Sequence, residues 1–267
     1  MDLPKLTNRF SYIVDGQEYQ LDHQWQLRPG AYTRRRDNGE LETRFNTVGK
    51  PAFDMLFDPN KRTFHVEYGT SKVPLYPWLK AMGVSDQQMQ ASWGKDIYEA
   101  NKNARGNDTA LQRLFKSRTG KEATAEEAKK FLQDTLAQSK LDPQTTETTL
   151  GKGFTEVTGD ALHLATEKLL KVHGGHPEDS RDALPFKKLR SAGDYIFDKI
   201  QAAAPATRLK VLRNLNSAAT PGSLLQKGYF EAPLRSAFHT NAAARVAAQI
   251  NPLDMLSGAS STTILGI

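Results

Sequence analysis

The sequence predicts an α+β protein, with antiparallel strands and hairpins in its N-terminal third, a mainly helical middle, and a helical, basic C-terminal part with an irregular tail. Two patterns predict this fold class. Up to residue 76, apolar residues alternate with polar ones between Asp-Gly and Asn-Gly turn signals, and from Pro77 onward they recur with the helical period. With 267 residues, of which 38% are hydrophobic, the chain is long enough to bury a core.

Three hairpins are expected in the first third of the chain. Their turns are Asp15-Gly16, Asp37-Asn38-Gly39 and Asp58-Pro59-Asn60, and alternating apolar residues flank each of them. Residues 27–30, Leu-Arg-Pro-Gly, predict a separate turn.

Helix starts are readable from their caps. Ser85 and Thr124 are each followed three residues later by Gln or Glu, which is the pattern of a capping box. Thr158 or Asp160 is expected to start a third helix, which the glycines at 174 and 175 end. Trp78 and Trp93 are expected to lie in the core.

The remaining segments give weaker patterns. Residues 140–156 are polar and rich in threonine, which favours a loop. Residues 187–213 are predicted as a basic helical segment with an interruption at 203–205, and residues 251–267 show no clear period.

The net charge of +6 lies in the C-terminal part of the chain. From residue 181 onward there are 11 basic and five acidic residues, so residues 1–180 are neutral overall. A basic C-terminal part suggests a polyanion as partner, but on charge alone a solvated basic surface is the favoured interpretation. For the run Arg34–Arg36, a solvated loop is favoured over phosphate contact.

No catalytic motif is present. Gly151-Lys152-Gly153 lacks the spacing of a phosphate-binding loop, and His173 and His176 lack further ligands for a metal ion. The absence of cysteine excludes disulfides, thiolate metal sites and a cysteine nucleophile. Because no Ser/His/Asp set and no Asp-x-Asp-x-Asp run is found, the sequence favours a binding or scaffolding role.

A membrane protein is not expected. No apolar run approaches the ~20 residues of a membrane helix, and the first residues lack the pattern of a signal peptide. The sequence therefore predicts a soluble protein of intracellular type.

Five segments, in order along the chain, resemble the β subunit of multisubunit DNA-directed RNA polymerases. Arg28-Pro29-Gly30 resembles part of that family's His-Arg-Ser-Pro-Gly-Val motif, and Asn251-Pro252-Leu253 resembles part of its fork. The segments are FSYIVDGQEYQLDHQWQLRPGAY (10–32), PAFDMLFDPNKRTFHVEYGTSKVPLYPWLKAMG (51–83), LQRLFKSRTGKEATAEEAKKFLQDTL (111–136), DALPFKKLRSAGD (182–194) and AQINPLDMLSG (248–258). Their order and compatible spacing make the combination much more specific than any single segment.

The resemblance implies an internal part of a β subunit. Residues 1–24 would be strands that join a protrusion-like domain, residues 25–178 a lobe-like domain, and residues 179–267 the return to the protrusion and the start of the fork. Such a chain would be either a split-gene subunit, as in large bacteriophages that encode their own polymerase, or an excised fragment. Its divergence from the cellular pattern favours the bacteriophage type.

The resemblance also implies site residues. In the family, the matching positions lie near single-stranded non-template DNA and the downstream duplex, which assigns DNA contact to Arg28, Asp182, Lys187, Lys188 and Arg190. Phe53 stands where the family has a Trp beside a non-template base, so its ring is expected to stack on a base. Tyr68 stands where the family has an Asp, which argues against a base-specific pocket of the family's type.

The fork segment implies proximity to the RNA–DNA hybrid and to the rifamycin pocket. Gln249, Asn251, Pro252 and Leu253 match the family there. Ala248 replaces its Asp, and residues 258–261 replace its His-Lys-Arg-Arg run, so the hydrogen-bonding side chains of that pocket are absent.

The implied function is that of a non-catalytic β-like subunit, or β fragment, which forms part of the DNA channel wall and the fork. The nucleotidyl-transferase reaction belongs to the whole polymerase, and its Mg²⁺ ions are held by a β′-like subunit, so no cofactor is expected on this chain. The implied partners are other β-like and β′-like chains, DNA, nascent RNA and, as a further candidate, a sigma-like promoter factor; no membrane is implied. The expected location is the cytoplasm of a bacterial host cell, with packaging in a virion as the variant for an early phage enzyme.

The alternative from a different class is a stand-alone basic nucleic-acid-binding module. Co-purification separates the two, because a polymerase chain is isolated with large β-like and β′-like partners in equal amounts. The isolated polymerase chain is also expected to expose apolar surface and to associate.

Overall fold

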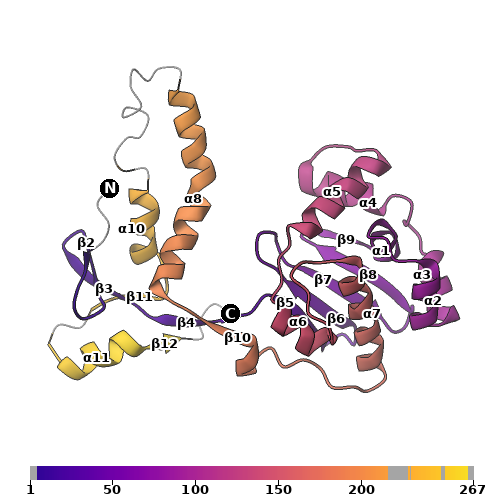
Figure 1. The fold of residues 1–267 in the computed structure, drawn as a ribbon, viewed down its shortest axis with the longest axis horizontal. Coiled ribbons are helices and arrows are strands. Elements are labelled where there is room, and N and C mark those ends of the chain that lie inside the picture. Colours follow the sequence, from indigo (N-terminus) through magenta and orange to yellow (C-terminus); the bar gives the residue numbers. More distant parts are fainter. Residues whose placement is uncertain (1–4, 216–227, 229, 248–249, 264–267) are drawn as a thin grey trace. The chain divides into compact units, whose positions relative to one another are not determined.

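The computed structural model describes residues 5–215, 228, 230–247 and 250–263. The fold is α+β, and the chain divides into two compact units that are described separately. The inserted unit is Leu27–Phe186, and the split unit combines Met1–Gln26 with Lys187–Ile267 (Figure 1).

The inserted unit contains a five-stranded antiparallel sheet in which the strands follow their order in the sequence. Its strands are β5 (Gly30–Arg35), β6 (Leu41–Asn46), β7 (Phe53–Asp58), β8 (Thr63–Tyr68) and β9 (Ser71–Pro74). The hairpins predicted at residues 37–39 and 58–60 are confirmed. Gly39 has a φ of +85°, which only glycine adopts without strain, and it therefore allows the tight turn between β5 and β6.

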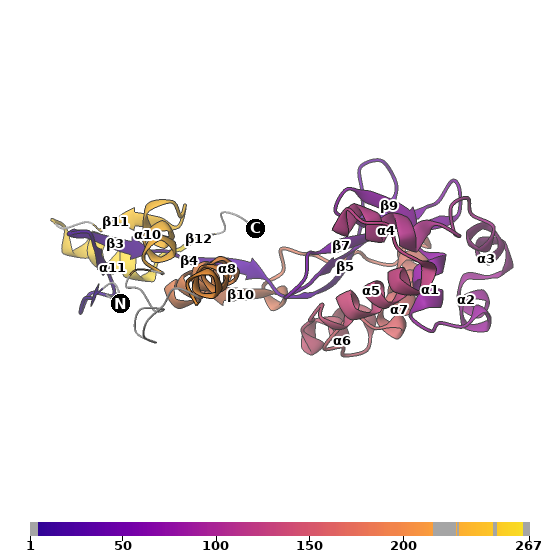
Figure 2. The ribbon, with the colours of Figure 1, turned by 90° about the horizontal axis from the view of Figure 1, so that it is seen from above.

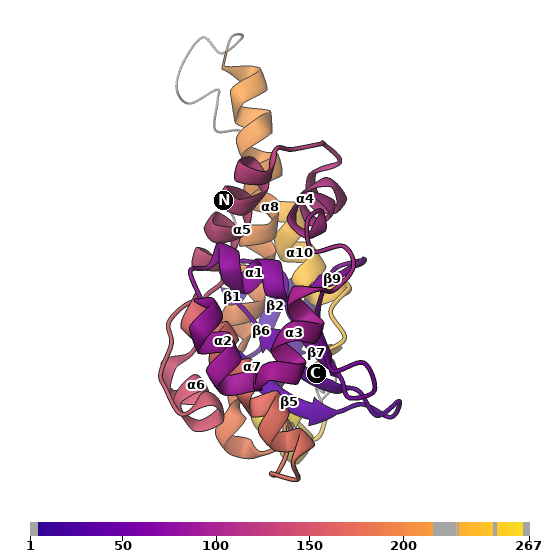
Figure 3. The same ribbon diagram turned by 90° about the vertical axis from the view of Figure 1, so that its right-hand side faces the viewer.

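Seven helices and one 3₁₀ turn complete the inserted unit: α1 (Tyr76–Ala81), α2 (Asp86–Trp93), α3 (Lys95–Lys102), α4 (Ala110–Thr119), α5 (Ala125–Ala137), α6 (Pro143–Leu150), α7 (Gly159–His173) and η1 (Leu184–Phe186). The predicted capping boxes are confirmed, because Ser85 and Gln88, and likewise Thr124 and Glu127, exchange side-chain and backbone hydrogen bonds. The Thr158 hydroxyl accepts from the Ala161 N–H at the start of α7. Figures 2 and 3 show this unit from two further directions, with α1, α2 and α3 towards the viewer in Figure 3.

One face of the sheet packs on the helices to form the core. Phe45 and Phe53 stack with ring centroids 4.8 Å apart, and Trp78 lies 5.6 Å from Phe53. Trp93 donates its indole N–H to the Thr166 hydroxyl of α7 at 2.8 Å. Both tryptophans are at most 4% exposed, which confirms the prediction that they belong to the core.

The prediction of a loop over residues 140–156 is wrong, because α6 lies there. Thr145, Thr146 and Thr149 are buried, and their hydroxyls hydrogen-bond to the Asp142 carboxylate or to backbone carbonyls of the same helix. Because each hydroxyl has a hydrogen-bond partner, burial leaves no polar group unsatisfied, and the threonine methyl groups pack like apolar side chains. Gly30 of β5 allows this close packing, since a Cβ there would collide with the Thr145 methyl group.

The inserted unit extends past residue 178, where the sequence analysis placed the end of the lobe-like domain. The Asp179 N–H donates to the Thr33 carbonyl at 2.8 Å, and its carboxylate accepts from the Thr33 N–H at 2.8 Å. These bonds cover the exposed edge of β5, which would otherwise be open to pairing with another strand. The segment around Asp179 is irregular and shows no hydrophobic periodicity. The sequence therefore did not indicate that it bonds to the sheet.

In the part that the structure describes, the split unit contains two small sheets and three helices. One sheet has the order β1 (Lys5–Leu6), β2 (Tyr12–Val14), β3 (Gln17–Leu21), β11 (Ala244–Val246), and the other β10 (Lys187–Arg190), β4 (His23–Leu27), β12 (Thr262–Thr263). The helices are α8 (Ala192–Asn214), α10 (Glu231–His239) and α11 (Pro252–Ser260). The predicted hairpin at Asp15-Gly16 is confirmed, with φ values of +50° and +81° at its two turn residues.

The core of the split unit is small. Val14, Leu21, Ala237 and Phe238 are its buried members, with partly buried neighbours that include Tyr12, whose ring lies 5.2 Å from that of Phe238.

Three sequence predictions in the split unit need correction. Residues 187–190 form a strand rather than the start of a helix, because they pair in the sheet with β4. Helix α8 continues through Pro205; this residue is exposed, so water can bond to the Gln201 carbonyl that loses its helical donor. The tail contains α11, which Asn251 caps by accepting from the Leu253 N–H.

Within the described ranges, no helix is both long enough and apolar enough to cross a lipid bilayer.

Candidate nucleic-acid interface

Arg28 lies in the turn between β4 and β5, and hydrogen bonds fix its backbone. Its N–H donates to the Phe186 carbonyl at 2.8 Å, and its own carbonyl accepts from the Tyr32 hydroxyl at 2.8 Å. The guanidinium forms an ion pair with Asp142 at 3.5 Å while its side chain remains 36% exposed. Arg28 is therefore partly engaged within the inserted unit, and its exposed part can contact a phosphate.

Asp142 is held in its ionised form. Burial raises the pKa of this carboxyl, but hydrogen bonds from Thr145 and the charge of Arg28 outweigh burial and lower it overall. The anchor of Arg28 is thus a stable negative charge at the start of α6.

Phe53 is a core residue of β7 and offers no face to a nucleic-acid base. It is 2% exposed, one ring face stacks on Phe45, and Tyr68 and Trp78 pack around it. Base stacking needs an accessible ring face, so the position of Phe53 argues against its predicted DNA contact. Tyr68 is also buried, and the Arg118 guanidinium covers its ring at 4.5 Å.

Among the predicted DNA contacts at 182–190, the side chains differ in exposure. Asp182 and Lys188 are exposed, whereas Lys187 is only 7% exposed on β10. A lysine that is buried and already engaged in the fold does not reach a phosphate, so Lys187 is a structural residue. Lys188 points to the opposite face of the strand, as alternation along β10 requires.

Arg190, at the end of β10, is fixed between two residues of α8. Its guanidinium lies 4.2 Å from the centre of the Tyr195 ring and forms an ion pair with Asp198. Its side chain is 21% exposed, so Arg190 keeps only part of its surface for a ligand. The stacked guanidinium is pre-oriented, which lowers the entropy cost when it binds an anion.

A hollow of about 390 Å³ in the split unit brings Arg190 together with residues that the sequence analysis missed. We call it the Arg190 hollow; its lining residues are Gln24, Arg190, Tyr195, Lys199, Thr240, Asn241, Ala242, Ala243 and Thr263. The Tyr195 hydroxyl donates to the Gln24 side chain at 2.9 Å and so joins α8 to β4. Arg190 and Lys199 give the hollow two cations, of which one is paired with Asp198.

Asn241 contributes a donor that has no acceptor in the described part of the chain. Its side-chain oxygen accepts from the Ala243 N–H at 3.1 Å, which fixes the orientation of the amide and leaves Nδ2 buried without a partner. Together with Lys199, this donor makes the Arg190 hollow suited to an anionic group. No sequence signal marked Lys199 or Asn241, since they come together only through the packing of α8 against the loop before β11.

The predicted fork residues lie at the start of α11. Asn251 and Pro252 are exposed, Leu253 is 74% exposed, and Gln249 lies outside the described residues. Asn251 acts as the N-cap of the helix, so its side chain already has a structural role. The exposed leucine is available to a partner.

Arg34 and Arg36 belong to an ion-pair network on the outer face of the sheet, and Arg35 points towards α7, so the run Arg34–Arg36 is not a solvated loop. Arg34 pairs with Glu42 at 3.2 Å, and Arg36 contacts Glu42 and, at 3.1 Å, Glu67. Arg35 pairs with Glu178 at 4.0 Å. These cations are neutralised within the inserted unit, which disfavours phosphate contact as well.

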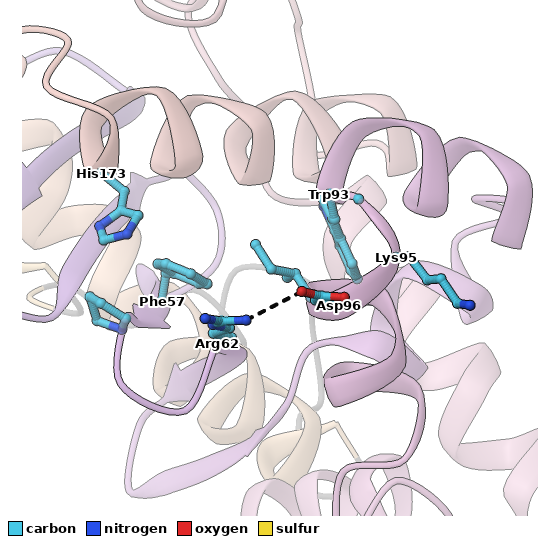
Figure 4. A pocket seen from close by; sticks show the side chains of 9 residues that line it. Phe57, Arg62, Trp93, Lys95, Asp96 and His173 are labelled. Atoms are coloured by element: carbon cyan, nitrogen blue, oxygen red, sulfur yellow. Dashed lines mark hydrogen bonds and ion pairs between the residues drawn. The ribbon is translucent and has the colours of Figure 1, made fainter.

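A second hollow, of about 420 Å³, lies in the inserted unit (Figure 4). Arg62 and Asp96 form an ion pair across it at 3.4 Å, while Lys95 points away and His173 stands at the other side. The rings of Phe57 and Trp93 both pack on Phe64 at 4.8 Å and are at most 4% exposed. They therefore offer no free face to a base, and this hollow is a weaker candidate than the Arg190 hollow.

Among the residues that the structure describes, no group of three or more His, Cys, Asp or Glu side chains is placed to hold a metal ion. No known protein-family profile matches the chain, and no curated protein shows significant similarity to it.

Proposed function

We propose that this chain is a non-catalytic, β-like part of a DNA-dependent RNA polymerase, where it forms part of the DNA channel wall and of the fork beside the RNA–DNA hybrid. The observation that carries the proposal is the order and spacing of the five segments between residues 10 and 258 that resemble the β subunit. The chain's role would be architectural, with the catalytic Mg²⁺ ions on a β′-like chain and the reaction carried out by the whole complex.

The chemistry of the Arg190 hollow supports contact with a nucleic-acid backbone. Lys199, the Asn241 amide and the exposed part of Arg190 are all donors, and two of the three are cations. Donors of this kind hold a phosphate and position a strand without reading its sequence. Lys188 is a further exposed cation on β10, the strand that carries Arg190.

Exposed apolar side chains of the split unit support the presence of partner chains. Leu253 and Leu256 of α11 are 74% and 71% exposed, and Ile250 before them is 96% exposed. Apolar residues that stand together on a surface mark interaction sites. A subunit of a larger assembly accounts for this surface, whereas a stand-alone binder does not.

Purification from the source cells tests the proposal. A tagged chain should be isolated in equal amounts with large β-like and β′-like chains, and the preparation should incorporate nucleotides into RNA on a DNA template. The stand-alone binding module, which the Arg190 hollow by itself would also fit, should instead be isolated as a monomer that binds nucleic acid alone. Isolation of such a monomer, without companion chains, would contradict the proposal.

The DNA contact can be tested with the double variant Lys188→Ala/Lys199→Ala. Removing one cation that neutralises a phosphate should lower the slope of log K against log salt by about 1, so the variant polymerase should bind DNA more weakly and with a slope reduced by about 2. Lys61→Ala, at a 76% exposed cation of the inserted unit, is the matched control and should leave the slope unchanged. An unaltered slope in the double variant would place the DNA elsewhere.

A polymerase that contains this chain should resist rifamycins. At positions 258–261 the residues Gly, Ala, Ser and Ser replace the family's basic side chains, so the drug loses its hydrogen-bonding partners. The measurement is RNA synthesis by the purified complex over a rifampicin titration, with a cellular bacterial polymerase as the sensitive control. Inhibition of both enzymes at the same drug concentration would refute the expectation.

A further inference from the structure

Helix α8 is far longer than its packing within the chain explains. It spans Ala192–Asn214, 23 residues, and Tyr195 is the only residue of this fully described helix that is buried. In Figure 1, α10 lies beside the N-terminal half of α8, and the C-terminal half extends beyond it. Since helices in proteins are stabilised mainly by packing an apolar face, the C-terminal half requires another surface.

Exposed apolar side chains of α8 and of its C-cap residue gather on one side. At 100° per residue, Phe197, Leu209, Leu212 and Leu215 fall within an arc of about 120°. They are 62%, 56%, 52% and 53% exposed. The arc, which we call the leucine face, is thus an apolar stripe that no described residue covers fully.

In the C-terminal half of α8, the charges on and beside the leucine face have one sign. Arg208 falls inside the arc and Arg213 lies just beside it, while Lys210 lies on nearly the opposite side of the helix. Residues 199–230 contain no Asp or Glu at all. A partner surface that matches this half of α8 must therefore combine apolar contacts with carboxylates or phosphates.

The position of Arg208 and the exposed leucines decide between the classes of partner. A nucleic-acid backbone provides no apolar surface for Leu209 and Leu212, so it would leave the leucine face in water. A lipid surface would cover the leucines but would force Arg208, which lies within the face, towards the acyl chains, where a charge is costly. An acidic polypeptide surface satisfies both, because a carboxylate can pair with Arg208 inside an apolar contact.

We infer that the C-terminal half of α8 docks on a partner polypeptide through the leucine face, and that the partner presents an apolar strip with a carboxylate opposite Arg208 and a further acidic residue facing Arg213. Under the proposed function, this partner is another chain of the polymerase, so the identity of the partner rests on the proposed function. The docking surface itself is independent of the Arg190 hollow, since none of its residues line that hollow.

Photo-crosslinking in the purified complex tests the inference. A photoreactive amino acid is placed at position 212, and the cross-linked segment is sequenced by mass spectrometry. The expected product joins α8 to a stoichiometric polypeptide partner, at a segment with apolar residues and an excess of Asp and Glu. A cross-link to nucleic acid or lipid, to a basic segment, or to no partner would overturn the inference.

Substitutions give an independent readout of the same interface. Leu209→Ser/Leu212→Ser should reduce the amount of co-purified partner by at least about tenfold, because two apolar side chains that the interface would bury are replaced by polar ones. Arg208→Gln should weaken association most at low salt, where its charge is least screened, and should remove part of the salt dependence. Lys61→Gln, at a 76% exposed position of the inserted unit, is the control and should leave the partner bound.

Two outcomes separate this inference from the proposed function. Since the substituted leucines are more than half exposed, the variants should keep the circular dichroism spectrum and melting temperature of the unmodified chain, and weaker association then reports the interface. If the acidic segment cross-linked from position 212 belongs to a chain unrelated to RNA polymerase, the docking inference stands and the proposed function fails. If polymerase chains co-purify but the leucine-to-serine variant retains them fully, the proposed function stands and the docking inference fails.

Discussion

The inserted unit and the split unit differ in how much of their apolar surface they bury themselves. In the inserted unit, one continuous cluster joins the sheet to its helices, and Trp78, Phe45 and Met89 are at most 1% exposed. Among the described residues of the split unit, the buried cluster comprises Val14, Leu21, Ala237 and Phe238, with a few partly buried neighbours.

Exposed side chains show the same difference. Among the described residues, Val48 and Leu184 are the large apolar side chains that the inserted unit exposes. The split unit exposes Leu6, Phe10, Ile13, Leu189, Phe197, Leu209, Leu212, Leu215, Val246, Ile250, Leu253 and Leu256. One unit therefore folds around its own core, whereas the other presents apolar surface that partner chains would cover.

Hydrogen exchange should reveal the largest difference between the units. In the isolated chain, amides of β6, β7 and β8 should exchange at least about 1000-fold more slowly than those in the C-terminal half of α8, because core strands exchange only on global unfolding. Mass spectrometry of deuterated peptides measures both regions in one sample. Equal protection of α8 and the central strands would remove the basis of the comparison.

A second test concerns the charged outer face of the inserted sheet. Arg36 contacts Glu42, whose side chain is only 2% exposed, so Arg36→Met would leave a buried carboxylate without its main partner. The variant should lose about 3 kcal/mol of unfolding free energy, measured by urea denaturation. Arg34→Met is the matched control: Arg34 pairs with the same carboxylate but is 47% exposed, so its loss should be below about 1 kcal/mol.

The same network should make the stability of the inserted unit depend on pH. Burial raises the pKa of Glu42, but hydrogen bonds from Arg36 and Arg34 outweigh it and hold the pKa below its ordinary value of 4.5. A lowered pKa in the folded state gives stability that is present above pH 4.5 and is lost as the pH falls through the folded pKa.

Asp54 has the opposite effect on the pH dependence of stability, because burial raises the pKa of its carboxyl above 3.8. Protonation of Asp54 below its folded pKa relieves the cost of its buried charge and offsets part of the loss at Glu42. Melting temperatures between about pH 6 and pH 3 should therefore fall less steeply in Glu42→Gln than in the unmodified chain. Identical profiles for the two proteins would show that Glu42 does not control the acid response.

Local signals in the sequence were sufficient for much of the secondary structure. Asp15-Gly16 and Gly39 close their hairpins because few other residues adopt the required positive φ. Ser85, Thr124 and Thr158 start helices because a hydroxyl can accept from the first free N–H groups. These signals act over three or four residues, so tertiary contacts do not override them.

The tertiary structure alone decided the positions that depend on distant partners. Thr145, Thr146 and Thr149 look like loop residues until α6 gives their hydroxyls acceptors, the Asp142 carboxylate or carbonyls of the helix, and places the Thr145 methyl group against Gly30. Phe53 and Lys187 looked available to DNA, but packing buries one in the sheet core and the other on β10.

The Arg190 hollow and the leucine face also depend on tertiary structure rather than on local sequence signals. Arg190, Lys199 and Asn241 are spread over the sequence, and only the packing of β10, α8 and the loop before β11 brings them to one hollow. The sequence by itself determined the charge, the turns and the helix caps, because these depend on neighbouring residues. Burial and shared sites required the structure, because each is a property of residues that meet only after the chain has folded.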